Sequence, residues 1–171
     1  TLTIRRASPD TSSPDAGRVQ LLVDAVDPAR RWLLSDAVLP GGALLQPDAL
    51  QLHDLETTIY YISNRSDGDA SLPSLRRKSL TRVAGTATFV DTEVIGGVED
   101  LQLQMHTARG VHTPDAVPPG MRVVAITVWL RVRSALAEAG HADNTTYVYA
   151  GHSAAPAIAE QRFRRVLVGL A

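Results

Sequence analysis

The histidines are the first residues whose type could support metal binding or proton transfer, because imidazole does both near neutral pH. No two of them have the i, i+4 spacing of a helical metal site. His53 beside Asp54, and His106 near His112, are the closest groupings. Neither pair has a third ligand nearby, so the sequence predicts no metal and no cofactor. The full set is His53, His106, His112, His141 and His152.

Nucleophilic catalysis is the second chemistry to consider. Gly151-His152-Ser153 comes nearest to a Gly-x-Ser-x-Gly elbow, but the second glycine is absent. Glu99 and Asp100 are adjacent carboxylates, and neighbouring residues of a strand point to opposite faces, so we expect no shared proton. The chain has no cysteine, which excludes thiolate nucleophiles and cysteine zinc sites. The sequence therefore predicts no catalytic residue, and we expect a protein that is not an enzyme.

Two further segments suggest ligands only weakly. Residues 64–69, Asn-Arg-Ser-Asp-Gly-Asp, are rich in oxygen ligands, but the glutamate at the twelfth position of an EF-hand loop is missing. A polar hairpin turn is the preferred interpretation, and bound calcium stays open at this point. Gly96-Gly97 precedes a predicted strand rather than a helix, so it does not form a phosphate-binding loop.

Charge and hydropathy argue against two classes of partner for the residues of this chain. There are 17 basic and 18 acidic residues, and the basic ones occur in short clusters close to acids. This pattern is typical of solvated strand faces and turns, and it predicts no nucleic-acid binding. The most apolar run, residues 123–130, is far shorter than the roughly 18–20 residues that cross a bilayer. The basic clusters are Arg5-Arg6, Arg30-Arg31, Arg76-Arg77-Lys78 and Arg164-Arg165.

Alternation of apolar and polar residues identifies the elements that must hold these side chains. Residues 98–107 place Leu101, Leu103 and Met105 on one side, and residues 121–133 alternate in the same way through Val124 and Val128. Loops are expected at 8–17 and 111–120, a loop or a single helical turn at 134–144, and a short helix at 154–161. The other predicted strands are 1–5, 18–26, 31–38, 50–52, 56–63, 74–80, 86–93 and 163–170.

These segments predict a mainly β fold of antiparallel sheets with hairpin connections. No long amphipathic helix is expected. The length fits a single domain over 1–171, with two packed sheets at about 1–55 and 56–171 as the alternative organisation.

Four phrases of the sequence carry a family resemblance through their order and spacing. The first phrase is residues 59–68 together with Pro-Ser-Leu-Arg-Arg at 73–77. It places Tyr60 and Tyr61 in a strand before a turn at Asp67-Gly68. Residues 122–134, Arg-Val-Val-Ala-Ile-Thr-Val-Trp-Leu-Arg-Val-Arg-Ser, form the third phrase, and Phe-Arg-Arg-Val-Leu-Val at 163–168 the last. The second phrase is residues 96–104, Gly-Gly-Val-Glu-Asp-Leu-Gln-Leu-Gln, and contains Gly97, Val98, Glu99, Asp100, Leu101 and Gln102. The third phrase contains Val124, Val128, Arg133 and Ser134.

Through the order and spacing of these four phrases, the chain from about residue 56 to 170 resembles the soluble head of PilW-type minor pilins of the type IV pilus. It departs from the family pattern at Arg76, where tyrosine is frequent, and at Met105-His106, where an aromatic residue and a glycine are common. The hydrophobic helix that begins a pilin is not in this sequence, and we expect it upstream of Thr1. Counting that helix, the resemblance implies an α+β pilin-like fold.

The resemblance implies a structural subunit that takes part in pilus assembly within a priming or tip complex. Its partners would be other minor pilins and a tip adhesin, and its only membrane contact would be the upstream helix. We expect it in the bacterial cell envelope, anchored in the inner membrane with a periplasmic head, or extracellular in the pilus. Without the helix, the face with Val124 and Val128 or the face with Leu101 should be partly uncovered. Strand edges are further expected contact sites for neighbouring subunits.

Three alternative interpretations remain at this point. A type II secretion pseudopilin of the J class shares the expected architecture, and genetic neighbours would separate it from a pilus subunit. A β-sandwich module that binds a glycan or peptide is a second alternative, although two tryptophans, four tyrosines and two phenylalanines offer few stacking platforms. An enzyme is the third, and it lacks a recognisable set of reacting groups.

Overall fold

The computed structural model describes residues 1–27, 29–35, 49–155 and 161–171. The expected helix at 154–161 and the end of the strand expected at 31–38 therefore lie largely outside the described residues. Contacts divide the chain into unit 1, which comprises Thr1, Tyr61–Arg76 and Glu93–Ala171, and unit 2, which comprises Leu2–Tyr60 and Arg77–Thr92. The expectation of one domain over 1–171 stays a prediction.

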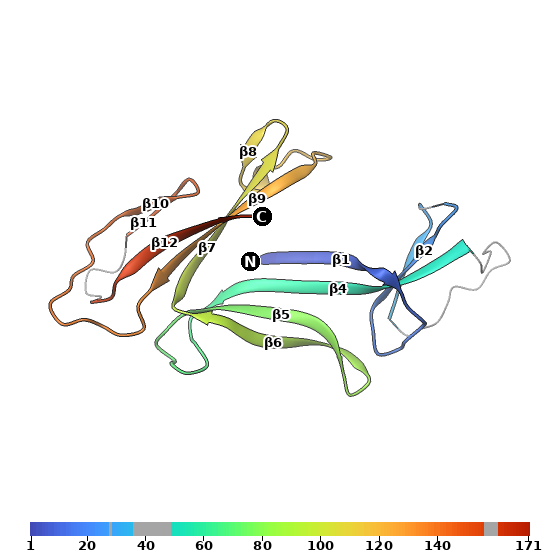
Figure 1. Cartoon of the computed structure of the whole chain (residues 1–171), viewed down its shortest axis with the longest axis horizontal. Coiled ribbons are helices and arrows are strands. Elements are labelled where there is room, and N and C mark those ends of the chain that lie inside the picture. Colours follow the sequence, from blue (N-terminus) through green and yellow to red (C-terminus); the bar gives the residue numbers. More distant parts are fainter. Residues whose placement is uncertain (28, 36–48, 156–160) are drawn as a thin grey trace. The chain divides into compact units, whose positions relative to one another are not determined.

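The fold is mainly β, with antiparallel sheets, which confirms the predicted class. The larger sheet has the order β3-β2-β4-β5-β6, and β1 also pairs with β4 (Figure 1). Strand β4 is long enough to pair with β2 near its start and with β1 over most of its remaining length. The strands are β1 (Leu2–Thr11), β2 (Gln20–Asp24), β3 (Arg31–Leu34), β4 (Leu50–Ser63), β5 (Ser74–Val83) and β6 (Thr86–Gly96).

Unit 2 has a small apolar core and a tight hairpin. Leu22, Leu34 and Leu52 are buried together, with Trp32 and Leu50 packed against them. The hairpin between β5 and β6 turns through Ala84 and Gly85, both with positive φ. Such a two-residue turn matches the right-handed twist of the strands that it joins.

Unit 1 contains a four-stranded sheet with the order β12-β9-β7-β8, and a separate two-stranded sheet of β10 and β11. Residues 98–107 form a strand with the predicted bounds, and β9 begins two residues later than expected. A 3₁₀ turn, η2 (Pro114–Ala116), follows β8. The strands are β7 (Val98–Thr107), β8 (Gly110–His112), β9 (Val123–Arg133), β10 (Tyr147–Tyr149), β11 (His152–Ala154) and β12 (Arg164–Leu170).

Several predicted boundaries were wrong, and one hairpin was missed. The strands predicted at 50–52 and 56–63 are one strand, β4. Strand β1 continues to Thr11, because its residues pair with β4 through a register irregularity, so the loop expected at 8–17 begins later. Strand β8 lies at the start of the loop expected at 111–120. The hairpin of β10 and β11 was missed, because three-residue strands are too short to show alternation.

The predicted apolar faces of β7 and β9 form one continuous face. Leu101 is opposite Leu130, and Leu103 is opposite Val128, so these side chains lie on the same side of the sheet. Leu103 is buried and its neighbours are half-buried, whereas Val124 is 66% exposed. Val124 is the unpaired residue of an irregularity between Val123 and Ala125, so the expectation of a partly uncovered face stays a prediction.

The backbone at Gly97 joins three segments of unit 1. Its N–H donates to the Pro73 carbonyl at 2.6 Å, and its carbonyl accepts from the Arg133 N–H at 2.8 Å. Its φ is +84°, and a Cβ built there would lie 2.6 Å from the Arg133 carbonyl oxygen. Both the dihedral angle and the close approach therefore require glycine.

We expect Gly97→Ala to lower the free energy of unfolding by about 2–4 kcal/mol, since left-handed strain and the clash add together. Gly169→Ala is the matched control, because Gly169 lies in a strand, has no positive φ, and would place its Cβ in open space. Urea unfolding of both variants measures the difference. Equal stability of the two variants would contradict this role of Gly97.

Candidate functional site

The candidate site is a group of ion pairs centred on Glu99, which lies in a β-bulge of β7. Val98 is opposite Val132 and Asp100 is opposite Arg131, so Glu99 is the extra residue in β7. Arg131, which shares a face with Asp100, donates from Nε to Glu99 Oε2 at 3.0 Å. The expectation that the two carboxylates point to opposite faces was wrong, because the bulge interrupts the alternation. Each carboxylate nevertheless has its own partners.

Glu99 is surrounded by three arginines. Arg164 Nε donates to both carboxylate oxygens, at 2.9 and 3.1 Å, and Arg133 Nη1 lies 3.5 Å from Oε1. The side chains of Glu99 and Arg164 are 10% and 2% exposed. Charges removed from water to this extent are stable only when they are paired and hydrogen-bonded. Glu99 therefore holds β7, β9 and β12 together through one carboxylate.

Arg164 is shared with a second carboxylate. Its Nη1 donates to Asp143 Oδ2 at 3.1 Å, and Asp143 also accepts from the Tyr147 hydroxyl and the Thr145 N–H. Burial alone would raise the pKa of Asp143, but the hydrogen bonds from Thr145, Arg164 and Tyr147 lower it overall. The network thus fixes the segment between β9 and β10, although that segment has no regular structure.

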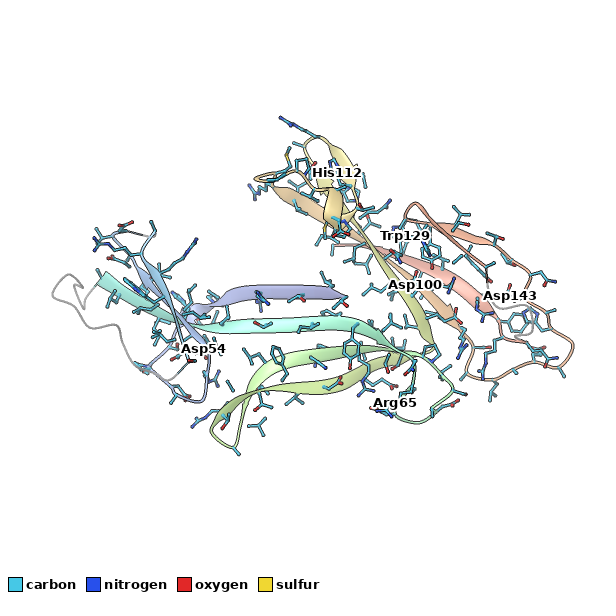
Figure 2. The ribbon with its side chains drawn as sticks, turned by 180° about the vertical axis from the view of Figure 1, so that it is seen from behind. Asp54, Arg65, Asp100, His112, Trp129 and Asp143 are labelled. Atoms are coloured by element: carbon cyan, nitrogen blue, oxygen red, sulfur yellow. The ribbon has the colours of Figure 1, made fainter. Side chains whose placement is uncertain are left out.

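A third contact connects β10 to the face of the sheet that carries Asp100 and Trp129, both of which are labelled in Figure 2. The Tyr149 hydroxyl donates to Asp100 Oδ2 at 2.6 Å, and its ring lies 6.4 Å from that of Trp129. Burial, followed by the hydrogen bond to Asp100, raises the pKa of Tyr149 above its ordinary value. Trp129 Nε1 in turn donates to Gln104. Tyr149 remains protonated at physiological pH and serves as a hydrogen-bond donor.

The predicted turn at 64–69 is built around a second set of ion pairs. Arg76 donates to Asp67 at 2.6 Å, and Glu93 accepts from the Asp67 N–H and from the Ser66 hydroxyl. Fully buried Ser74 donates to the Arg65 carbonyl at 2.8 Å. Among the residues that the structure describes, no group of three histidine, aspartate or glutamate side chains is placed to hold a metal ion.

The histidines do not converge within the described part of the chain. His53 contacts the Ser8 carbonyl in unit 2, while His106 contacts the Thr127 hydroxyl in unit 1. His141 stacks on Phe163, with ring centroids 4.1 Å apart. Each of these three histidines has a local packing or hydrogen-bonding role.

An open depression of about 610 Å³ lies in unit 2 beside the loop that joins β1 and β2. Gln20, which is fully buried, donates to Ser12, Ser13 and Asp54 and accepts from the Asp15 N–H. Burial would raise the pKa of Asp54, but the hydrogen bonds from Gln20, Ser12 and Arg18 lower it. The polar groups that line this depression are therefore engaged in shaping the loop.

The structure brings together only part of the set that carries the resemblance. Gly97, Val98, Glu99, Arg133 and Ser134 meet at the end of the four-stranded sheet, where the Ser134 N–H donates to the Phe163 carbonyl. The rest lie elsewhere: Tyr60 in β4 opposite Leu2, Tyr61 later in β4, Asp67 and Gly68 in the turn, Asp100, Leu101 and Gln102 along β7, and Val124 and Val128 in β9.

Sequence reasoning missed Arg164, Asp143 and Tyr149. Arg164 was assigned with Arg165 to a solvated face, and that assignment was wrong because two carboxylates surround its guanidinium. The available signal was the alternation of Arg131 and Arg133 in the strand predicted at 121–133. Asp143 and Tyr149 gave no such signal, since neither lies in a long alternating segment.

No helix among the described residues is long and apolar enough to cross a membrane.

We expect Glu99→Gln to lower the free energy of unfolding by about 3–5 kcal/mol, because buried arginine charges lose their shared counter-charge. Glu56→Gln removes the exposed pair with Arg6, at 2.6 Å, and should cost no more than about 1 kcal/mol. Denaturant unfolding at neutral pH compares the two variants. A loss for Glu99→Gln no larger than the control would refute the central role of this carboxylate.

The lowered pKa of Asp143 predicts a specific acid response. The folded-state pKa lies below the ordinary 3.8, so its stabilising contribution is complete above that value. It is lost as the pH falls through the folded-state pKa. We expect Asp143→Asn to flatten the decline in stability below about pH 4 relative to the unmodified chain. Thermal unfolding measured from pH 2 to 6 tests this, and parallel pH profiles would contradict it.

No protein-family model, curated protein or solved structure matches this chain. The assignment of function therefore depends on its residues and their geometry.

Proposed function

We propose that the chain is the head of a structural subunit that takes part in type IV pilus assembly, of the PilW-type minor pilin class. It would act in a priming or tip complex with other minor pilins, in the cell envelope or on the extracellular pilus. The type II secretion pseudopilin of the J class is the second candidate, because the same architecture serves both machines.

The observation that carries this proposal is the convergence of the four phrases. The Gly97 backbone bonds the first phrase at Pro73 and the third at Arg133. Glu99 of the second phrase binds Arg131 and Arg133 of the third and Arg164 of the last. Phrases that occur in a set order in the sequence thus form one bonded unit in space, and this convergence is the structural support for the proposal.

The chemistry of the ion-pair cluster, which comprises Glu99, Asp143 and Arg131, Arg133 and Arg164, also supports a structural role. Its charged groups are paired with one another, and the hydroxyls of Tyr147 and Tyr149 donate to carboxylates. A catalytic group needs a free electron pair or proton directed at a substrate, whereas the carboxylates of Glu99, Asp100 and Asp143 all accept hydrogen bonds within the protein. Val124 is 66% exposed at the start of β9, which is compatible with packing against a further segment.

The decisive experiment is to determine the intact mass and N-terminal residues of the native protein from the membrane fraction of its source cell. We expect a form longer than this chain that begins with about 20–25 apolar residues, enough to span a bilayer as a helix. Deletion of the gene should then remove surface pili. Loss of protein secretion with normal pili would favour the pseudopilin instead.

A native protein that begins near Thr1 and is recovered without detergent would overturn both candidates. Complementation supplies a matched control. A gene encoding Glu56→Gln should restore pili, whereas one encoding Glu99→Gln should fail, because the head would no longer fold stably.

A further inference from the structure

Strand β12 forms one end of the four-stranded sheet, and no other strand of the described residues pairs with its outer side. The inner side bonds β9. The N–H and carbonyl of Ala171 bond those of Ile126, both at 2.8 Å, and the Phe163 carbonyl accepts from Ser134. Because the register with β9 is regular, Leu167 and Gly169 also direct their backbone groups inward.

The intervening residues therefore direct their N–H and carbonyl groups to the outside. These are Val166, Val168 and Leu170, and Arg164 before them. The outward carbonyl of Arg164 is covered by the Tyr147 hydroxyl at 3.5 Å. Further along, the side chains become exposed, reaching 61% at Val168 and 74% at Leu170. The open part of the edge thus runs from Val166 to Leu170.

This edge lacks the usual protection against pairing. Natural edge strands carry charged residues, prolines or bulges that discourage another strand from adding. Residues 166–170 are Val-Leu-Val-Gly-Leu, without a charge or a proline. The opposite situation holds at β6, an end strand of the larger sheet that carries Asp91 and Glu93. An open apolar edge of this kind favours strand addition.

We propose that β12 pairs with β12 of a second copy of this chain, antiparallel and with Val168 opposite Val168. In that register Val166 lies opposite Leu170, so every outward residue of the open edge forms a hydrogen-bonded pair. Leu167 lies opposite Gly169, and Arg165 lies opposite Ala171. No arginine faces an arginine, and apolar side chains meet directly on the face of Val166, Val168 and Leu170.

The self-complementarity of the edge is the reason to assign a second copy as the occupant. A two-fold axis through Val168 relates equal donors and acceptors, as a symmetric dimer requires. A pairing of this length buries little surface, so the dimer belongs to the weak, concentration-dependent class. This inference is independent of the proposed function, because it uses only the edge of unit 1.

Cysteine cross-linking tests the register, and the chain has no cysteine to interfere. In the proposed dimer the two Val168 Cα atoms lie about 5.5 Å apart, within the disulfide range of roughly 4.4–6.8 Å. Leu167 is the matched control, with a similar exposure of 51%. Its two copies would be diagonal neighbours about 7–8 Å apart, beyond that range.

We expect Val168→Cys to form a disulfide dimer at least ten times faster than Leu167→Cys under mild oxidation. Equal rates for the two variants, or faster cross-linking of Leu167→Cys, would overturn the register.

Proline substitution tests the hydrogen bonds in the reduced, cysteine-free chain. Val168→Pro removes an outward N–H and leaves the bonds to β9 intact, which an edge strand tolerates. Sedimentation over a concentration series should show a monomer–dimer equilibrium for the unmodified chain and for Val168→Thr, and a monomer for Val168→Pro. Circular dichroism checks that the variants fold. A concentration-independent monomer, or a dimer that persists in folded Val168→Pro, would overturn the proposal.

Discussion

One buried carboxylate imposes the strongest constraint on unit 1. Glu99 cannot leave water unless positive charge accompanies it, and the accompanying charge comes from Arg131, Arg133 and Arg164. Those arginines lie on two strands, so pairing the charges also sets the order of β7, β9 and β12. The bulge is part of the same arrangement, because it presents Glu99 and Asp100 on one side and gives each its own partners.

In unit 2 an uncharged side chain, that of Gln20, fixes the loop before β2. The side chain of Gln20 is fully buried, and its amide satisfies three acceptors and one backbone donor around the loop before β2. A satisfied amide avoids the large desolvation cost of a charge, although it still fixes one loop conformation. The two units therefore use different polar groups to specify structures whose apolar cores are small.

The long strands could be predicted from the sequence because alternation over residues 98–107 and 121–133 is nearly uninterrupted. The mainly β class followed from the same pattern. The ion-pair cluster around Glu99 could not be predicted, because it depends on the pairing register of β7 with β9. A one-residue bulge at Glu99 decides which side chains meet, and Arg164 is separated from Glu99 by 65 positions. Short strands such as β10 and β11 were missed because three residues are too few to show an alternation of apolar and polar residues.

The division into units affects the order in which the chain becomes able to fold during synthesis. Unit 2 is complete only when Thr92 has been made, since its last strands return after the insertion of Tyr61–Arg76. Unit 1 must wait longer, because Glu99 remains without its closest guanidinium until Arg164 emerges. Contacts between positions so far apart slow folding, since a long loop must close first. A nascent chain that ends before Arg164 would contain Arg131 and Arg133 but lack the guanidinium that bonds both oxygens of Glu99, which makes the last strand the step that commits unit 1 to its native structure.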